Sequence, residues 1–379
     1  MSKVSISKLD SYDIEKLYQA IESSLNLLGG ISAFISPGEK VLLKPNLLDG
    51  LPPERAANTH PEFVRAVIRL VKKTGAKIFV GDSPGFGPAQ RAAKGAGILK
   101  VCEEENIGFL NFHAQTELSL GQNFSMKKLL IASDVLKMDK IINLPKLKSH
   151  QLTYFTGAVK NLFGLVPGMR KAEYHLKRPA REDFINLLLD IALRFKPTLN
   201  IMDAILVQEG PHGPMNGDPR QLGLVLASSD ALAIDSIAAQ IIGIDFKEHQ
   251  LLSLGEKRGL GNIRGIEVLG EDLSAVKVTD FKLVEKGYDA MLPRALPLWL
   301  AKYLQALLLD KVRVEKSKCS HCQRCAEICQ AQAISMENTY PTFDYAKCIR
   351  CFCCQEMCPA GAIELKKSFL GKIILRIFS

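Results

Sequence analysis

The residues best suited to chemistry in this sequence are nine cysteines gathered in one short segment. The chain has ten cysteines in 379 residues, and nine of them lie between Cys319 and Cys358. Eight form two runs of identical spacing, C-x2-C-x2-C-x3-C, and a proline follows the second run. In such a run the first three thiolates surround one cubane cluster and the fourth reaches the other cluster. The doubled spacing therefore predicts two 4Fe-4S clusters.

Because the fourth cysteine of each run reaches the other cluster, the ligands of each cluster can be assigned. We predict one cluster held by Cys319, Cys322, Cys325 and Cys358, and a second held by Cys348, Cys351, Cys354 and Cys329. Zinc is the alternative, but a tetrahedral zinc site gains nothing from the third and fourth cysteines of each run. Cys353 is left over and is interpreted as a small buried hydrophobic residue, with a spare ligand or redox thiol as the alternative. Cys102 is interpreted as a structural residue of a helix.

The segment from about 316 to 366 resembles bacterial two-cluster ferredoxins. The resemblance implies a small α+β domain that transfers one electron per cluster and does not itself select a substrate. One departure is that Gln330 follows Cys329, where proline is usual, so the turn at that ligand is expected to be looser.

The rest of the chain is ordinary in composition, with 47% hydrophobic and 23% charged residues, which excludes a disordered or collagen-like protein. The net charge is +9, and residues 311–379 carry 11 Lys and Arg against 6 Asp and Glu. Two clusters with eight thiolates would nearly cancel that local excess. Neither an export signal nor an uninterrupted apolar stretch of about 20 residues is visible, so we expect a cytoplasmic protein without a transmembrane segment.

Short apolar runs alternate with helical patterns over residues 1 to about 285, which predicts an α/β body built on a largely parallel sheet. The predicted strands are Lys3–Ile6, Lys40–Leu43, Lys77–Gly81, Ile107–Phe112, Lys140–Leu144, Thr198–Ala204, Leu222–Ala227 and Ile266–Gly270. The predicted helices are Asp10–Leu28, His60–Thr74, Glu182–Arg194 and Asp230–Ile242.

We predict three parts: an α/β body (residues 1–290), an apolar helical linker (291–315) and a cysteine module (316–379) of the ferredoxin type, ending in a basic apolar segment. The linker helix, Leu298–Leu309, is expected to pack on the body. The alternative is an interfacial helix that contacts a membrane surface peripherally, helped by the segment 369–378.

Within the body, residues 137–181 contain ten Lys and Arg and only two acids, which favours an anionic ligand. Polar residues also follow three predicted strands, where open α/β sheets bind their ligands. The residues after these strand ends are Lys44, Asn46, Asp82, Ser83, Lys146, Lys148, His150, Lys160 and Asn161. The sequence therefore predicts an anion-binding crevice, with a solvated basic face as the alternative.

Common cofactor loops are missing from the sequence. Neither a dinucleotide fingerprint nor a Walker lysine motif occurs, so the sequence leaves open a flavin or other organic cofactor. Nucleic acid is not expected, because the basic segment lacks a regular helix of charges and aromatic residues make up only 7% of the chain.

Several strings, among them VLLKPNLL, INLPKLKSHQLTYFTGAVKNLFG and SSDALAIDSIAAQIIGI, resemble the domain of unknown function 362, an iron-sulfur protein family often fused to a ferredoxin module. The resemblance covers about residues 41–270 and implies an α/β domain with a polar site. The matching positions are Lys44, Asn46, Thr59, His60, Asp82, Ser83, Lys146, Lys148, His150, Lys160, Asn161, Glu209, Asp230 and Asp235. Asp230 and Asp235 also suit structural roles, with Asp230 placed as a helix N-cap.

The function predicted from the sequence is that of an iron-sulfur redox protein passing low-potential electrons to or from an anionic ligand, cofactor or partner at the crevice. If the body is catalytic, His150 or His60 would donate protons, and Lys44, Lys146 and Lys160 would neutralise negative charge. The alternatives are a non-enzymatic electron carrier or activator that docks a redox protein, and a maturation factor. Whether the chain is an oxidoreductase stays open at this point.

Overall fold

The computed structural model describes residues 1–247, 249–284, 310–366 and 368. The body is built on one mixed sheet with the strand order β12-β1-β11-β10-β7-β2-β3-β4. Its strands are β1 (Lys3–Lys8), β2 (Lys40–Pro45), β3 (Lys77–Gly81), β4 (Gly108–Leu110), β7 (Lys140–Leu144), β10 (Leu199–Glu209), β11 (Asp218–Ser228) and β12 (Glu267–Gly270). The pairs from β10 through β7, β2 and β3 to β4 are parallel, while β11 runs antiparallel to both of its neighbours. The prediction of a mixed α/β body with a largely parallel sheet is confirmed.

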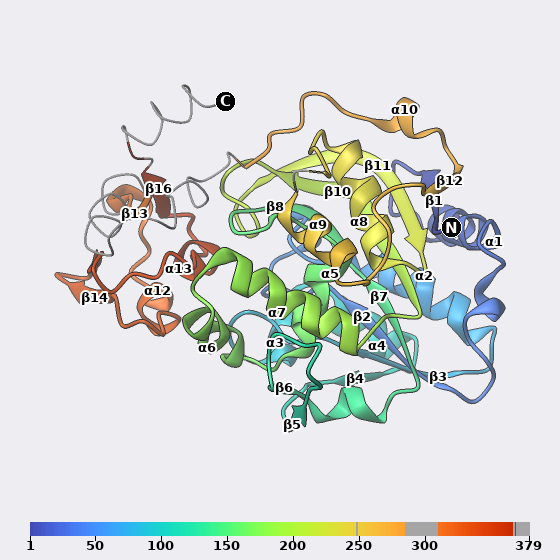
Figure 1. The fold of residues 1–379 in the computed structure, drawn as a ribbon, viewed down its shortest axis with the longest axis horizontal. Coiled ribbons are helices and arrows are strands. Elements are labelled where there is room, and N and C mark those ends of the chain that lie inside the picture. The colour runs from blue at the N-terminus through green and yellow to red at the C-terminus, as the bar shows by residue number, and fades with distance from the viewer. Residues whose placement is uncertain (248, 285–309, 367, 369–379) are drawn as a thin grey trace.

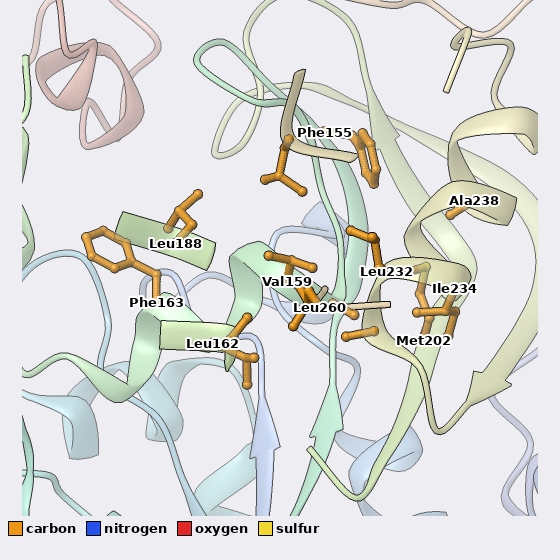
Figure 2. Packing of buried hydrophobic residues seen from close by; sticks show 14 of the residues in the cluster. Phe155, Val159, Leu162, Phe163, Leu188, Met202, Leu232, Ile234, Ala238 and Leu260 are labelled. Atoms are coloured by element: carbon orange, nitrogen blue, oxygen red, sulfur yellow. The ribbon is translucent and has the colours of Figure 1, made fainter. Parts of the chain in front are cut away.

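Helices cover both faces of the sheet, as Figure 1 shows. The helices of the body are α1 (Ile14–Asn26), α2 (Pro61–Lys72), α3 (Ala89–Gly95), α4 (Ile98–Glu104), α5 (Ala158–Asn161), α6 (Arg170–Lys177), α7 (Arg181–Arg194), α8 (Ala231–Ile241), α9 (Gln250–Lys257) and α10 (Leu273–Val276). Alternate residues of a strand enter different cores: Val41 and Leu43 pack with α1, α2 and α4, whereas Leu42 packs with the core of α5, α7, α8 and α9. Part of the second core is drawn in Figure 2.

The sequence patterns located most main strands and the four long helices, with ends shifted by a few residues. They missed the short hairpin β5 (Gln115–Ser119) and β6 (Lys128–Ala132), and also β8 (Lys146–His150) and β9 (Tyr154–Thr156). The segment from Lys146 to His150, predicted as a strand-end loop, is the buried strand β8, which pairs with β10 and β9. Its polar residues carry no alternating pattern, so nothing in the sequence signalled a strand.

The cysteine module is a small α+β unit. Its elements are β13 (Lys311–Val314), α12 (Arg324–Glu327), β14 (Ile334–Glu337), β15 (Tyr340–Phe343), α13 (Cys353–Glu356) and β16 (Ile363–Lys366). The strands pair antiparallel as β13 with β16 and β14 with β15. Because β13 belongs to this sheet, the module begins at Lys311, inside the segment predicted as linker. The predicted helix Leu298–Leu309 and the segment 369–378 lie outside the described residues.

The module sits against the end of the body near α6 and α7 (Figure 1). A small apolar core joins the two parts, with Met215 from the body packed among Ile328, Cys353 and Met357 from the module. Arg324 Nη1 lies 2.6 Å from Asp49 Oδ2, and Asn216 Nδ2 donates to the Cys358 carbonyl at 2.8 Å. Buried apolar contacts reinforced by polar ones fix the module on the body. Among the described residues, every helix is too short or too polar to cross a lipid bilayer.

Candidate functional site

The strand ends and the module line a cavity of about 90 Å³, called here the polar cavity. Its lining includes six residues predicted from the sequence, namely Asn46, Asp82, Ser83, His150, Lys160 and Asn161. Asn46 follows β2, Asp82 and Ser83 follow β3, and Lys160 and Asn161 come from α5. The carboxyl ends of adjacent parallel strands meet at one sheet edge, which brings these residues together as predicted.

Lys44 and Asp82 form a buried ion pair at this edge. Lys44 Nζ lies 2.8 Å from Asp82 Oδ1, and the second oxygen of Asp82 accepts the Leu47 amide at 2.7 Å. Burial lowers the pKa of Lys44, an effect that the Asp82 carboxylate opposes. Gly164 packs against the pair so closely that a Cβ at this position would overlap Asp82 Oδ1. Lys44 therefore positions Asp82 instead of facing a ligand.

The amide side chains of the cavity are held by a chain of hydrogen bonds. Asn46 Nδ2 donates to Asn161 Oδ1 at 2.9 Å, and Asn161 Nδ2 donates to Asn143 Oδ1 at 2.8 Å. The Asn46 backbone amide donates to Thr59 Oγ1 at 2.8 Å, and that hydroxyl donates to the Leu144 carbonyl at 2.7 Å. Thr59 thus connects the Asn46 backbone to the end of β7. The Asn46 side-chain oxygen is buried and has no hydrogen-bond partner among the described residues, so it is free to accept from a ligand.

His150 links the body to the module. Its Nδ1 accepts the Leu152 and Thr153 amides at 3.1 and 3.3 Å, so the neutral ring carries its proton on Nε2. Nε2 lies 2.8 Å from the Oε1 atom of Glu356 in α13. Burial lowers the pKa of His150 to about 4, and the Glu356 carboxylate opposes this shift. A neutral His150 therefore presents its ring N–H to an ionised carboxylate.

The charge of Glu356 is maintained by the groups around it. Burial disfavours the carboxylate, but His150, Lys160 and His175 outweigh it and lower the pKa of Glu356 to about 2. The Lys160 ammonium makes no hydrogen bond or ion pair with any residue in the described part of the chain, although burial lowers its pKa and Glu356 opposes that shift. Lys160 is thus the cation of this cavity best placed to receive an anion.

Two further groups lining the cavity were not predicted as site residues. Burial lowers the pKa of Lys171 to about 7, and its ammonium donates to the Ser83 and Pro84 carbonyls at 2.6 and 3.0 Å. His175 stacks on Phe184 with ring centroids 4.1 Å apart. Both residues belong to the basic segment 137–181, and this charge excess was the sequence signal that could have identified them. Glu356 was missed because it lies among the cysteines and was not connected with the body.

Other predicted residues lie elsewhere. Lys146 Nζ is 2.7 Å from Asp203 Oδ2 and donates to Tyr12 Oη at 2.9 Å, and His60 stacks on Tyr12 at 3.6 Å. His60 also caps α2, with Nδ1 accepting the Glu62 amide at 3.2 Å. These residues form a separate polar cluster, and the prediction that Lys146 faces a crevice with Asn46 is not matched by its contacts.

Lys148 does not line the cavity either. It is fully buried, donates to the Ala57 carbonyl, and has a pKa well below the usual value because of burial and the neighbouring Lys160. Both lysines lie on β8, which pairs with β10 with a register shift between Asp203 and Gln208. Lys148 lacks a carboxylate partner within ion-pair distance among the described residues, so its buried amine is a structural hydrogen-bond donor.

The remaining acidic residues have structural contacts. Glu209 Oε2 lies 3.1 Å from Arg220 Nη1 and accepts the Lys282 amide at 3.0 Å, away from the polar cavity. Asp230 caps α8 by accepting the Leu232 and Ala233 amides, as expected for an N-cap.

Asp235 accepts the Ala158 and Val159 amides at the start of α5, at 2.5 and 3.0 Å. Burial raises its pKa to about 7 although these two hydrogen bonds oppose the shift. Asp235 therefore holds the short helix that carries Lys160 and Asn161.

The eight predicted cluster ligands fall into the two expected groups. A cavity of about 30 Å³, called here the cysteine cavity, is lined by Cys329 together with Cys348, Cys351 and Cys354. Cys319, Cys325 and Cys358 share an apolar core on the module, and Cys322 and Cys358 both act electrostatically on the Cys325 thiol. Each group thus joins three cysteines of one run with the last cysteine of the other.

These residues suit a cubane cluster by their chemistry. Cys329 Sγ accepts the Ala333 amide at 3.3 Å, and Cys358 Sγ accepts the Ala362 amide at 3.2 Å, contacts of the kind that stabilise thiolate ligands. Among the described residues, no three His, Cys, Asp or Glu side chains meet closely enough to bind a single metal ion. A cubane places its four thiolates on four different irons, so its ligands need not converge on one point.

Two solved structures are weakly similar to this chain. Solved structures of a protein from Thermotoga maritima and of the lactate racemase apoprotein from Thermoanaerobacterium thermosaccharolyticum are similar at 13% and 14% identity, with TM-scores of 0.37 and 0.38. The matches cover 66% and 61% of this chain, and the chain spans 60% and 55% of those structures. Such low scores carry no argument about function.

A curated relative is more similar in sequence. The Thylakoid-associated protein sll1697 of Synechocystis sp. (strain ATCC 27184 / PCC 6803 / Kazusa) is 38% identical over 261 residues, which cover 69% of this chain and 80% of the relative. The sequence profile of the Domain of unknown function (DUF362) matches residues 41–240, a stretch that contains the strand ends of the polar cavity and stops before the cysteines. The chain belongs to the DUF362 family.

Proposed function

We propose that this protein is an iron-sulfur redox protein in which two 4Fe-4S clusters held by the cysteine module exchange low-potential electrons with an anionic ligand in the polar cavity. The observation that carries the proposal is the composition of the cavity wall. Asn46, His150 and Lys160 come from the body, whereas Cys353 and Glu356 come from the module, next to the predicted ligand Cys354. Bound clusters would supply one-electron transfer.

The body residues would bind and orient the ligand. Lys160 offers a positive charge, the Asn46 side-chain oxygen accepts a hydrogen bond, and Ser83 lines the same cavity. Phe163 and Phe184 form an apolar side that excludes water and strengthens the polar contacts. A small carboxylate or similar oxyanion with an apolar part suits this lining.

His150 would present a neutral ring N–H at the cavity wall. Its Nε2 carries the ring hydrogen and lines the cavity beside Glu356. The ring keeps this hydrogen, because its loss from a neutral imidazole would leave an imidazolate, and the ionised Glu356 carboxylate has no proton to return. His60, the other predicted proton donor, contacts Tyr12 instead and has no place in this proposal.

The first experiment measures metal and sulfide. Anaerobically purified or reconstituted protein is expected to contain about eight irons and eight acid-labile sulfides per chain, because the doubled motif supplies eight ligands. Four or fewer irons after full reconstitution would contradict the two-cluster assignment. Cys102→Ser is the matched control, because Cys102 is a buried thiol of α4 in the body, outside the module, and its loss should leave the iron content unchanged.

A second experiment identifies what the cavity holds. A small acid or a flavin that co-purifies with the protein, and is lost with Lys160→Gln, would support an enzyme. A stoichiometric redox protein retained instead would favour the carrier or activator alternative, and transfer of clusters to an apoprotein would favour a maturation factor.

We also propose a cytoplasmic location, since the cytoplasm keeps clustered thiols reduced. The word thylakoid in the name of the Synechocystis relative points to a membrane surface, which is the competing expectation. Fractionation of cells separates the two, because recovery in the membrane fraction at physiological salt would contradict the cytoplasmic proposal.

A further inference from the structure

The polar cavity and the cysteine cavity share part of their walls. Ala172 of α6, Ile328 after α12 and Cys353 of α13 line both cavities. Residues that line two cavities separate them, so one layer of residues lies between the ligand space of the body and the thiols of Cys348, Cys351, Cys354 and Cys329. This set of four thiols is called site two.

The packing of the module distinguishes the two groups of cysteines. Cys351 and Cys354 of site two pack against the apolar core that joins module and body, together with Met215 of the body. Cys319, Cys325 and Cys358 pack in the module's own core with Val312 and Ile363, and Cys354 of site two also contacts that core. Cys319, Cys325 and Cys358, with Cys322, are called site one. Site two therefore packs against the interface core, whereas the side chains of site one pack in the module's own core and their contact with the body is through the Cys358 carbonyl.

Exposure distinguishes the two sites further. Residues 320–323 are all exposed, and Cys322 is the exposed member of the eight predicted ligands. On the inner side, Cys353 is 7% exposed and lines the polar cavity together with Lys160 and Glu356. Lys160 thus lies within electrostatic reach of the wall between the cavities.

We propose that site two is the inner site, facing the ligand through the wall made by Ala172, Ile328 and Cys353, and that site one is the outer site, which an external redox protein meets. Cys353 is then a positioning residue of that wall and not a cluster ligand. This inference rests on the proposed function and adds the order of the two sites to it.

The test compares two lysines that differ in position. Reduced full-length protein is titrated potentiometrically and followed by electron paramagnetic resonance, with the signals assigned through Cys322→Ser, which alters site one. Removing a positive charge makes reduction less favourable. Lys160→Gln is therefore expected to shift the potential of site two downward and leave site one unchanged. Lys316→Gln, at an exposed lysine of the module, is the matched control and should leave site two unchanged.

A shift at site one, equal shifts at both sites, or no shift with Lys160→Gln would overturn the assigned order. The iron content of each variant is measured in the same samples, so that a misfolded variant is recognised. Protein without clusters would refute the proposed function itself. Intact clusters with the reverse order would refute the present inference alone.

A second measurement needs no variant in the cavity. A soluble dysprosium chelate accelerates the spin relaxation of clusters near the surface. In the native chain it should affect the signal of site one more strongly than that of site two, because Cys322 is exposed and site two is covered by the body. A stronger effect on site two would contradict the proposal.

Discussion

At the scale of single residues, the cavity depends on groups that never face a ligand. Lys44 and Asp82 are almost fully buried, at 0% and 2% side-chain exposure, and their ion pair anchors the Leu47 amide next to Asn46. Removing one partner of such a pair leaves an uncompensated buried charge, which typically costs about 3–5 kcal/mol. Gly164 is the residue that leaves room for the pair.

Gly164→Ala should therefore destabilise the protein by about 3 kcal/mol or more. The added methyl would overlap Asp82 Oδ1 and lie 2.7 Å from Lys44 Nζ, which forces the pair apart. Anaerobic urea unfolding followed by circular dichroism measures the loss. Gly121→Ala is the control, because its Cβ would meet no atom within 4 Å and should change stability by less than about 0.5 kcal/mol. Equal behaviour of the two variants would contradict the account of Gly164.

At the scale of elements, the two short helices α12 and α13 place the last cysteine of each run beside the other run. Cys329 follows α12 and lines the cysteine cavity with Cys348, Cys351 and Cys354 of the second run. The helical turn between the third and fourth cysteines of a run directs the fourth away from its own loop. The same helix α13 carries Glu356 to His150, so one element serves both the module and the cavity.

Cys329→Ala should remove about four irons and abolish the signal of site two, while the signal of site one remains. The reason is the crossing of the ligand between the runs. Iron analysis and electron paramagnetic resonance measure both results. Cys353→Ala is the matched control in the same module and should keep about eight irons. Loss of the site-one signal with site two intact would disprove the crossing.

At the scale of the whole molecule, buried neutral histidines make stability depend on pH. Burial lowers the pKa of His150, His175 and His249 to about 4, from an ordinary value of 6.5. The unfolded chain binds more protons than the folded chain between these values, so stability is full above pH 6.5 and falls as the pH drops toward 4. Asp235, with its pKa raised to about 7, acts in the opposite direction and weakens the slope.

His175→Phe should make this acid-side loss shallower by about 1.4 kcal/mol per pH unit between pH 6 and 4.5. Phenylalanine preserves the stacking on Phe184 but cannot take up a proton. Unfolding free energies measured across this range in both proteins give the two slopes. Identical slopes would show that protonation of His175 does not contribute to acid unfolding.

The sequence alone determined the features that depend on local pattern. Hydrophobic periodicity located the long helices and most sheet strands, because burial on one face leaves a period in the chain. The spacing of the cysteines predicted their two groups, since a loop of fixed length can reach only certain positions. Residues after parallel strands, such as Asn46 and Ser83, were predicted to share a crevice from the geometry of such sheets.

Only the tertiary structure decided which polar residues face the cavity and what closes it. Lys146 and Lys148 lie on an unpredicted strand that pairs with β10, where they contact Asp203 and the Ala57 carbonyl and do not line the polar cavity. Glu356 meets His150 across 206 positions of sequence, a contact that no local pattern can encode. Local pattern fixes which face of an element is buried, whereas the partner on that face is selected by packing of the whole chain.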